Sequence, residues 1–180
     1  MQSPLGNFPE AWRAVDRPDL VAPPVLEALT IWSAGEEVLV VDTDPELADT
    51  ANFCAAYDVA PQASANCVVV AGKRGGAVTM AACLVLASTR ADVNGLVRKQ
   101  LDVRKASFAP VETAVAETAM EYGGITPIGL PAGWPLLIDA AVADTAHVII
   151  GSGRRRAKLL VPGKHLGTLP RAQILADLGI

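Results

Sequence analysis

Paired glycines and a proline form the segment of this sequence that is best suited to hold a ligand against main-chain groups. The segment reads Tyr-Gly-Gly-Ile-Thr-Pro-Ile-Gly over residues 122–129. Adjacent glycines let a backbone approach a ligand closely with N–H groups free to point at it, and the proline stiffens the exit of the loop. Such a loop can cradle a carbonyl or carboxylate group. The same residues also suit an ordinary turn between a helix and a strand.

A second glycine-containing turn carries the most basic run of the chain. Gly-Ser-Gly at residues 151–153 is followed by three arginines at 154–156, with Lys158 and Lys164 nearby. Guanidinium groups match phosphate oxygens in bidentate geometry, so this turn is the best candidate for contact with an RNA backbone or a terminal nucleotide. A solvated surface turn is the alternative. The segment is not a P-loop, because the Gly-Lys-Ser/Thr ending is absent.

Other polar residues give weaker indications. Asp139 ends an apolar strand, where its carboxylate could orient an ammonium group or cap the next turn. Ser152, His147 and His165 do not show a spacing that indicates a catalytic triad. The cysteines are Cys54, Cys67 and Cys83. Their odd number and the lack of a CxxC pair argue against a zinc site, and we predict neither a metal nor a cofactor.

Composition and charge narrow the class of protein. The chain has 180 residues, of which 51% are apolar and 19% charged, with a net charge of −4. A phosphate-binding surface must therefore be a local patch. The basic pairs at 73–74, 98–99 and 104–105 are interpreted as solubilising surface charge. No apolar run reaches the roughly 18 residues of a membrane span, and residues 1–13 lack the features of a signal peptide, so we expect a cytoplasmic protein that binds neither membrane nor DNA.

The pattern of apolar residues predicts a mixture of short helices and strands in one domain, 1–180. Helices are expected at 23–34, 44–57, 92–97 and 110–120. Strands are expected at 37–42, 66–71, 78–87, 105–109, 136–139, 147–151 and 158–161, with a short strand or tail at 171–175. Glycines at 72–76 predict a hairpin turn, which favours an antiparallel or mixed sheet. Residues 1–22 are expected to be a loosely attached lead-in.

These segments, in this order, resemble the YbaK/prolyl-tRNA-synthetase-associated family of aminoacyl-tRNA editing domains over about residues 37–173. The strongest element is Gly123–Gly129, which resembles the Gly-x-x-x-Pro loop of that family. The strand that ends at Asp139 and the turn at 151–154 follow at similar distances. The resemblance implies an α+β fold with a mixed, mostly antiparallel, barrel-like sheet surrounded by short helices. It also implies hydrolysis of the ester of a mischarged tRNA without a protein nucleophile.

The resemblance also assigns roles to individual residues. The catalytic group is Asn66, Gly123 and Gly124. The substrate-binding group is Ile125, Thr126, Pro127, Asp139, Gly151, Ser152, Gly153 and Arg154. Asn66 departs from the family, because it stands where the family carries a lysine and an amide supplies no positive charge.

Three functions remain open at this point. The first is a free-standing deacylase that binds the acceptor end of aminoacyl-tRNA, with a synthetase as a further partner. The second is an aminoacyl-binding module that has lost hydrolysis, as the neutral Asn66 suggests. The third is a hydrolase of another small ester.

Overall fold

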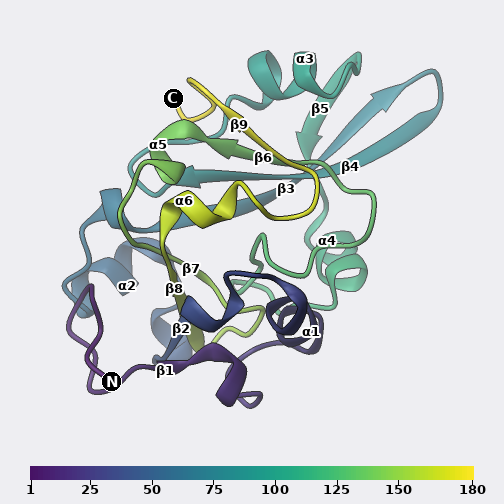
Figure 1. Ribbon diagram of the computed structural model, residues 1–180. Coiled ribbons are helices and arrows are strands. Elements are labelled where there is room, and N and C mark those ends of the chain that lie inside the picture. Colours follow the sequence, from purple (N-terminus) through teal and green to yellow (C-terminus); the bar gives the residue numbers. More distant parts are fainter.

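Two packed β-sheets with short helices around them make up the computed structural model, which describes residues 1–180 (Figure 1). The four-stranded sheet has the order β1-β2-β8-β7, with β1 at Trp12–Arg13, β2 at Leu39–Asp42, β8 at Ala157–Val161 and β7 at Val148–Gly151. The five-stranded sheet has the order β5-β3-β4-β6-β9, with β5 at Lys105–Phe108, β3 at Ala65–Arg74, β4 at Ala77–Leu86, β6 at Leu136–Asp139 and β9 at Ala172–Leu175.

The predicted fold class is confirmed as α+β with mixed, mostly antiparallel pairing. Of the seven strand pairs, only β4–β6 and β6–β9 are parallel. The sheets stay open and do not close into a barrel. They meet at a single isolated bridge, between Ser64 before β3 and Ile149 of β7.

The predicted hairpin is present, but its strands are longer than expected. Gly75 and Gly76 alone form the turn, with φ of 55° and 82°, a backbone region that glycine enters without steric cost. Lys73 was expected in the turn and instead continues β3. It pairs with Val78 of β4 on one side and with Lys105 of β5 on the other.

The helices are short, and aspartate side chains cap the start of several of them. The α-helices are α1 Pro23–Ile31, α2 Thr50–Ala56, α3 Arg98–Gln100, α4 Val111–Thr118, α5 Ala140–Ala143 and α6 Gly163–Leu166. Short 3-10 helices lie at Ala14–Asp16, Gly35–Glu37, Pro45–Leu47 and Pro61–Ala63, and a π-helical turn at Val93–Val97. None of these helices is long and apolar enough to cross a membrane.

The single helix expected from Asp44 to Tyr57 is interrupted. Asp44 caps only the 3-10 helix Pro45–Leu47, by accepting a hydrogen bond from the Glu46 N–H. Asp49 then starts α2 with a second cap, on the N–H of Asn52. An aspartate before the first helical residue satisfies N–H groups that have no partner within the helix, so the second cap allows a new start.

Apolar side chains fill three layers. The largest cluster lies between the sheets and includes Val40, Leu84 and Leu159. A second cluster covers the outer face of the five-stranded sheet under residues 93–103. A third packs Phe53 of α2 and its neighbours on the outer face of the four-stranded sheet. Strand residues alternate between these faces, as the two-residue period of a strand requires.

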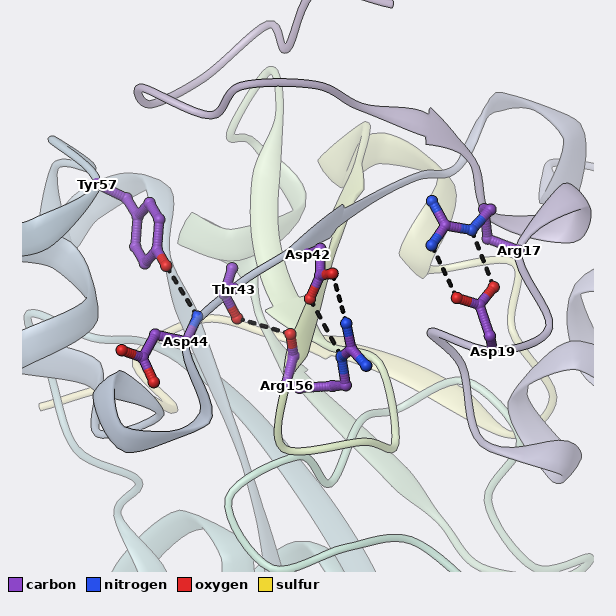
Figure 2. A network of polar contacts seen from close by, with 7 residues as sticks. All are labelled: Arg17, Asp19, Asp42, Thr43, Asp44, Tyr57 and Arg156. Carbon is purple, nitrogen blue, oxygen red and sulfur yellow. Dashed lines mark hydrogen bonds and ion pairs between the residues drawn. The ribbon is translucent and has the colours of Figure 1, made fainter.

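The N-terminal segment is packed into the molecule, which corrects the expectation that residues 1–22 are loosely attached. Trp12 pairs with Val40 in the four-stranded sheet, and Leu20 and Val21 are fully buried in the central cluster. Figure 2 shows the Arg17–Asp19 ion pair within this segment. Scattered prolines and glycines conceal this role in the sequence, because the buried residues follow no helical or strand period.

Candidate active site

A cleft with a volume of about 460 Å³ opens beside the outer edge of β3. β5 covers that edge only from Val70 onward, and β7 reaches it only before β3 begins, at Ser64. The edge of β3 between these contacts is free. The Val69 carbonyl accepts a hydrogen bond from the N–H of Ala109, and main-chain groups two residues apart face the same edge of a strand. The N–H and C=O of Cys67 therefore face the opening.

The two glycine segments singled out in the sequence pack backbone against backbone at one wall of the cleft. The N–H of Gly153 donates to the carbonyl of Gly124 at 2.7 Å. A Cβ atom on Gly151 would lie 2.3 Å from that same carbonyl oxygen, so glycine is required there. Gly123, Ile125 and Gly151 line the cleft as a result.

The three consecutive arginines have different surroundings. Arg156 is held outside the cleft by the Asp42 carboxylate, at 2.5 Å, as Figure 2 shows. Arg154 is also directed away, because its Nε donates to the Val21 carbonyl at 3.0 Å. Only Arg155 lines the cleft. Its guanidinium carbon lies 5.8 Å from the centre of the Tyr122 ring, within the range of a cation–π contact.

Lys158 of β8 also lines the cleft, and only 8% of its surface is exposed. Its Nζ lies 5.4 Å from the centre of the Phe53 ring. Burial lowers the pKa of this ammonium group, and the positive charge of Arg155 lowers it further. The cleft thus contains two cations, Lys158 at depth and Arg155 beside Tyr122.

Asn66 lies in the cleft and is held by a neighbour. The Thr50 hydroxyl donates to its side-chain carbonyl oxygen at 2.7 Å, which leaves the amide N–H groups of Asn66 free of that bond. Thr50 and Asp49, both at the start of α2, line the cleft as well. The remaining walls are mostly apolar and come from β3, the end of β5 and the start of α4: Ala65, Val68, Val69, Phe108, Ala109, Val111 and Ala114.

Seven of the predicted site residues do not line the cleft: Gly124, Thr126, Pro127, Asp139, Ser152, Gly153 and Arg154. Gly124, Gly153 and Arg154 support the wall described above. Asp139 is buried at the end of β6, opposite Leu175 of β9. Thr126 is fully buried, and its hydroxyl has no hydrogen-bond partner. The four that do line it are Asn66, Gly123, Ile125 and Gly151.

Comparison with known proteins identifies the fold family. The sequence profile of the aminoacyl-tRNA editing domain matches residues 44–169, which include every segment that forms the cleft. The chain belongs to this family. The resemblance inferred from the sequence is confirmed. No curated protein matches the chain at the level of sequence.

Solved structures share the fold of this editing domain over most of its length. A candidate trans-editing enzyme for prolyl-tRNA synthetase has a TM-score of 0.73 at 21% identity, covering 87% of this chain and 97% of that one. The hypothetical protein APE2540 has a TM-score of 0.75 at 20% identity, with 87% and 99% covered. A scaffold used for computational epitope grafting has a TM-score of 0.73 at 22% identity, with 86% and 95% covered. At these identities the likeness concerns the fold alone.

Sequence reasoning missed several residues of the editing domain's cleft. Asp49 and Thr50 lie in a segment read only as helix, and Phe108 in one read only as strand. Lys158 was noted only as part of a basic stretch. The signal that could have identified it is its place in the run Ala-Lys-Leu-Leu-Val, which is buried throughout, since lysine is almost never fully buried without a partner.

Proposed function

We propose that this editing domain is a free-standing deacylase that hydrolyses the ester of mischarged aminoacyl-tRNA in trans. The observation that carries the proposal is the cleft itself. It combines main-chain groups of a free strand edge and a glycine loop with two cations, Arg155 and Lys158, among apolar walls. An aminoacyl ester presents a carbonyl group, an ammonium group and a side chain. The main-chain donors and cations of the cleft suit the carbonyl oxygen, the Asp49 carboxylate suits the ammonium group, and the apolar walls suit the side chain.

The proposed reaction needs no nucleophile from the protein. Water adds to the ester carbonyl carbon as an electron pair moves onto the carbonyl oxygen. The bond from that carbon to the ribose oxygen then breaks, and the ribose oxygen takes up a proton while the added water loses one. Cys67, the one thiol in the cleft, stays protonated at neutral pH, because burial and the neighbouring Cys83 raise its pKa.

Donors around the carbonyl oxygen would lower the barrier. A hydrogen bond or positive charge that is already in place stabilises the oxyanion of the transition state. In our proposal the main chain at Gly123 and Cys67 and the amide of Asn66 surround the aminoacyl group. Gly124, Ile125, Thr126 and Pro127 hold the loop in shape.

A second candidate function is an aminoacyl-binding module without hydrolysis. The observation in its favour is Asn66, whose side chain is neutral and already engaged by Thr50. Loss of catalysis with retention of the cleft would give this outcome. The two cations in the cleft favour the deacylase, because a cleft that only binds the aminoacyl group does not need charge beside the ester.

The test is deacylation of a panel of aminoacyl-tRNAs by the wild type and by Gly123→Val. Gly123 has φ of 81°, and an added Cβ would lie 2.7 Å from Nη1 of Arg155. A displacement of about 1 Å in a catalytic site can cost about 100-fold in rate, and we expect a loss of at least that order. Initial rates of aminoacyl ester cleavage measure it.

The matched control is Gly133→Val. Gly133 also has a positive φ, of 88°, but no atom lies within 4 Å of its added Cβ. This variant carries similar backbone strain away from the cleft and is expected to keep turnover. Turnover that is lost equally in both variants would contradict the role of the Gly123 loop. Turnover by Asn66→Lys alone, with an inactive wild type, would establish the binding module.

A further inference from the structure

Lys158 occupies a position that the fold otherwise reserves for apolar side chains. All five residues of β8 are buried. Ala157 and Leu159 face the central cluster, and Leu160 faces the outer cluster under α2. Residues two apart share a face of a strand, so Lys158 points to the same side as Leu160, toward Phe53 and the cleft.

The ammonium group of Lys158 contacts the Phe53 ring but has no oxygen partner in the protein. It forms no hydrogen bond and no ion pair with any residue. Its charged or titratable neighbours are Arg155 on the adjoining turn, and Asp49 and Cys54 on α2. Asp49 lines the same cleft but forms no ion pair with it. Thr126 Oγ1 is the only fully buried side-chain nitrogen or oxygen atom without a hydrogen-bond partner, so the Lys158 Nζ is accessible from the cleft, where an oxygen atom of a ligand can accept its hydrogen bonds.

We propose that the Lys158 ammonium group is a catalytic cation that binds the carbonyl oxygen of the substrate ester and stabilises the negative charge that forms there during hydrolysis. The inference rests on the proposed deacylase function. It also resolves the difficulty raised by Asn66, because a positive charge reaches the cleft from β8 instead of from β3.

Depth in the cleft distinguishes the ester carbonyl from the other oxygen-rich group of the substrate, the terminal phosphate. Lys158 is 8% exposed and lies against Phe53. Arg155 is more exposed and lies beside Tyr122, which is 63% exposed. The aminoacyl group must enter the cleft, whereas the nucleotide that carries it remains nearer to solvent. The buried cation therefore meets the ester, and Arg155 is the one near the phosphate.

The experiment compares the wild type, Lys158→Met and Lys158→Arg in steady-state deacylation. Methionine keeps the length of the side chain without its charge, and arginine keeps the charge. We expect kcat to fall by at least about 100-fold in Lys158→Met, the usual effect of removing one group that stabilises an oxyanion. The KM for aminoacyl-tRNA should change by less than about 3-fold, and Lys158→Arg should recover part of the rate. A rise in KM with an unchanged kcat would assign Lys158 to the phosphate and overturn the proposal.

The pH dependence of kcat separates a cation from a base. If the ammonium form is active, the wild-type rate falls as the pH rises through the lowered pKa of Lys158. Lys158→Met should lack that fall. A rate that rises with pH in the wild type but not in Lys158→Met would show that the neutral amine removes a proton from water, and would also overturn the proposal.

A binding measurement keeps the inference testable if the wild type proves inactive. The probes are aminoacyl amides of 3′-amino-3′-deoxyadenosine, in which an amide replaces the ester, with the same amino acids as in the deacylation panel. Calorimetry should show binding about 10-fold weaker to Lys158→Met than to the wild type. Equal binding to both would overturn the role of Lys158. Weaker binding together with an inactive wild type would overturn the deacylase alone.

A stability measurement excludes misfolding as the cause of lost activity. Since the native state holds the Lys158 proton less tightly than the unfolded chain, the unfolded chain binds more protons between the lowered pKa and the ordinary value of 10.5. The contribution of Lys158 to the stability of the wild type against unfolding should therefore rise with pH in that window. Lys158→Met should lack this increase and should be at least as stable as the wild type at neutral pH. A variant that is less stable would contradict the unpaired state of the ammonium group.

Discussion

The hydroxyl of Thr126 is an unusual feature at the scale of single residues. It is completely buried and has no hydrogen-bond partner. An unsatisfied buried polar group costs about 1–3 kcal/mol. Thr126→Val replaces that hydroxyl by a methyl group of similar shape, and we expect the free energy of unfolding to rise by about 1 kcal/mol. Urea denaturation followed by circular dichroism measures the change.

Thr118→Val is the matched control for this prediction. Thr118 is also buried, but its hydroxyl donates to the Ala114 carbonyl at 2.7 Å. Its removal should lower the free energy of unfolding by about 1 kcal/mol. Loss of stability in Thr126→Val would contradict the absence of a partner. A gain in stability with loss of deacylation would indicate that the hydroxyl serves the substrate, as the sequence predicted.

At this scale the sequence predicts the roles of residues that are close together in the chain, but not the contacts between residues that are far apart. The Gly-x-x-x-Pro loop follows from consecutive residues, so its glycines could be identified directly. The relation between Asn66 and Lys158 could not, because the two residues are 92 positions apart and share a cleft only through the arrangement of the two sheets. No periodicity reports such an arrangement.

At the scale of elements, the β3–β4 hairpin extends beyond the rest of the molecule (Figure 1). Lys73 and Arg74 near its tip gather with Arg104 and Lys105 of the β5 segment around one surface hollow. Arg74 pairs with Asp102 at 2.6 Å. The other three cations form no ion pair, and β5 leads from this hollow to Phe108 at the cleft.

We predict that this basic hollow contacts the phosphates of the tRNA. Reversing two charges, in Lys73→Glu with Lys105→Glu, should raise the KM for aminoacyl-tRNA by about 10-fold or more, because phosphate contacts dominate affinity for nucleic acid. The kcat should stay unchanged, and so should hydrolysis of a minimal aminoacyl-adenosine. Steady-state kinetics at two salt concentrations measures the effect.

Arg90→Glu with Arg171→Glu is the control for the hairpin, since it changes the net charge equally at exposed positions elsewhere. If both pairs of substitutions raise the KM equally, the effect comes from net charge alone and the hairpin has no specific contact with the tRNA. A KM that is unchanged in the hairpin pair would support the original interpretation, in which these residues only improve solubility.

The elements themselves were predictable where each has its own local signal. Asp92 caps residues 93–97 as expected, by accepting hydrogen bonds from the N–H groups of Gly95 and Leu96. The hairpin and α4 also form where the sequence indicated. The interruption of the Asp44–Tyr57 helix was missed. Asp44 and Asp49 can each cap a helix, and the residues between and after them are mostly good helix formers, so only tertiary packing determines that both aspartates act as caps.

At the scale of the whole molecule, the N-terminal segment completes the core and supports the wall of the cleft. Leu20 lies fully buried in the central cluster. The N–H of Ala22 donates to the Ser152 carbonyl at 3.1 Å. An added Cβ on Gly153 would lie 2.5 Å from the Cβ of Ala22. Removal of packing here therefore affects both the core and the turn at 151–154.

We predict that Leu20→Ala lowers the free energy of unfolding by about 2–5 kcal/mol, the usual effect of truncating a buried leucine. Ile31→Ala removes a large apolar side chain that is 83% exposed and should change stability by less than about 0.5 kcal/mol. Guanidinium denaturation measures both. A small effect of Leu20→Ala would support the original expectation that residues 1–22 are loosely attached. Coincident transitions in tryptophan fluorescence and circular dichroism would support a single domain, 1–180.

The free edge of β3 has a consequence for how copies of this protein behave in concentrated solution. An uncovered strand edge is a template on which another chain can add a strand, and natural sheets protect such edges with charges, bulges or covering segments. Here the free stretch is short, because the N–H of Ala109 already bonds the Val69 carbonyl at one end and Ser64 bridges to β7 at the other. A neighbouring strand would find only these few residues to pair with, so the contacts that bound the cleft also protect the sheet against aggregation.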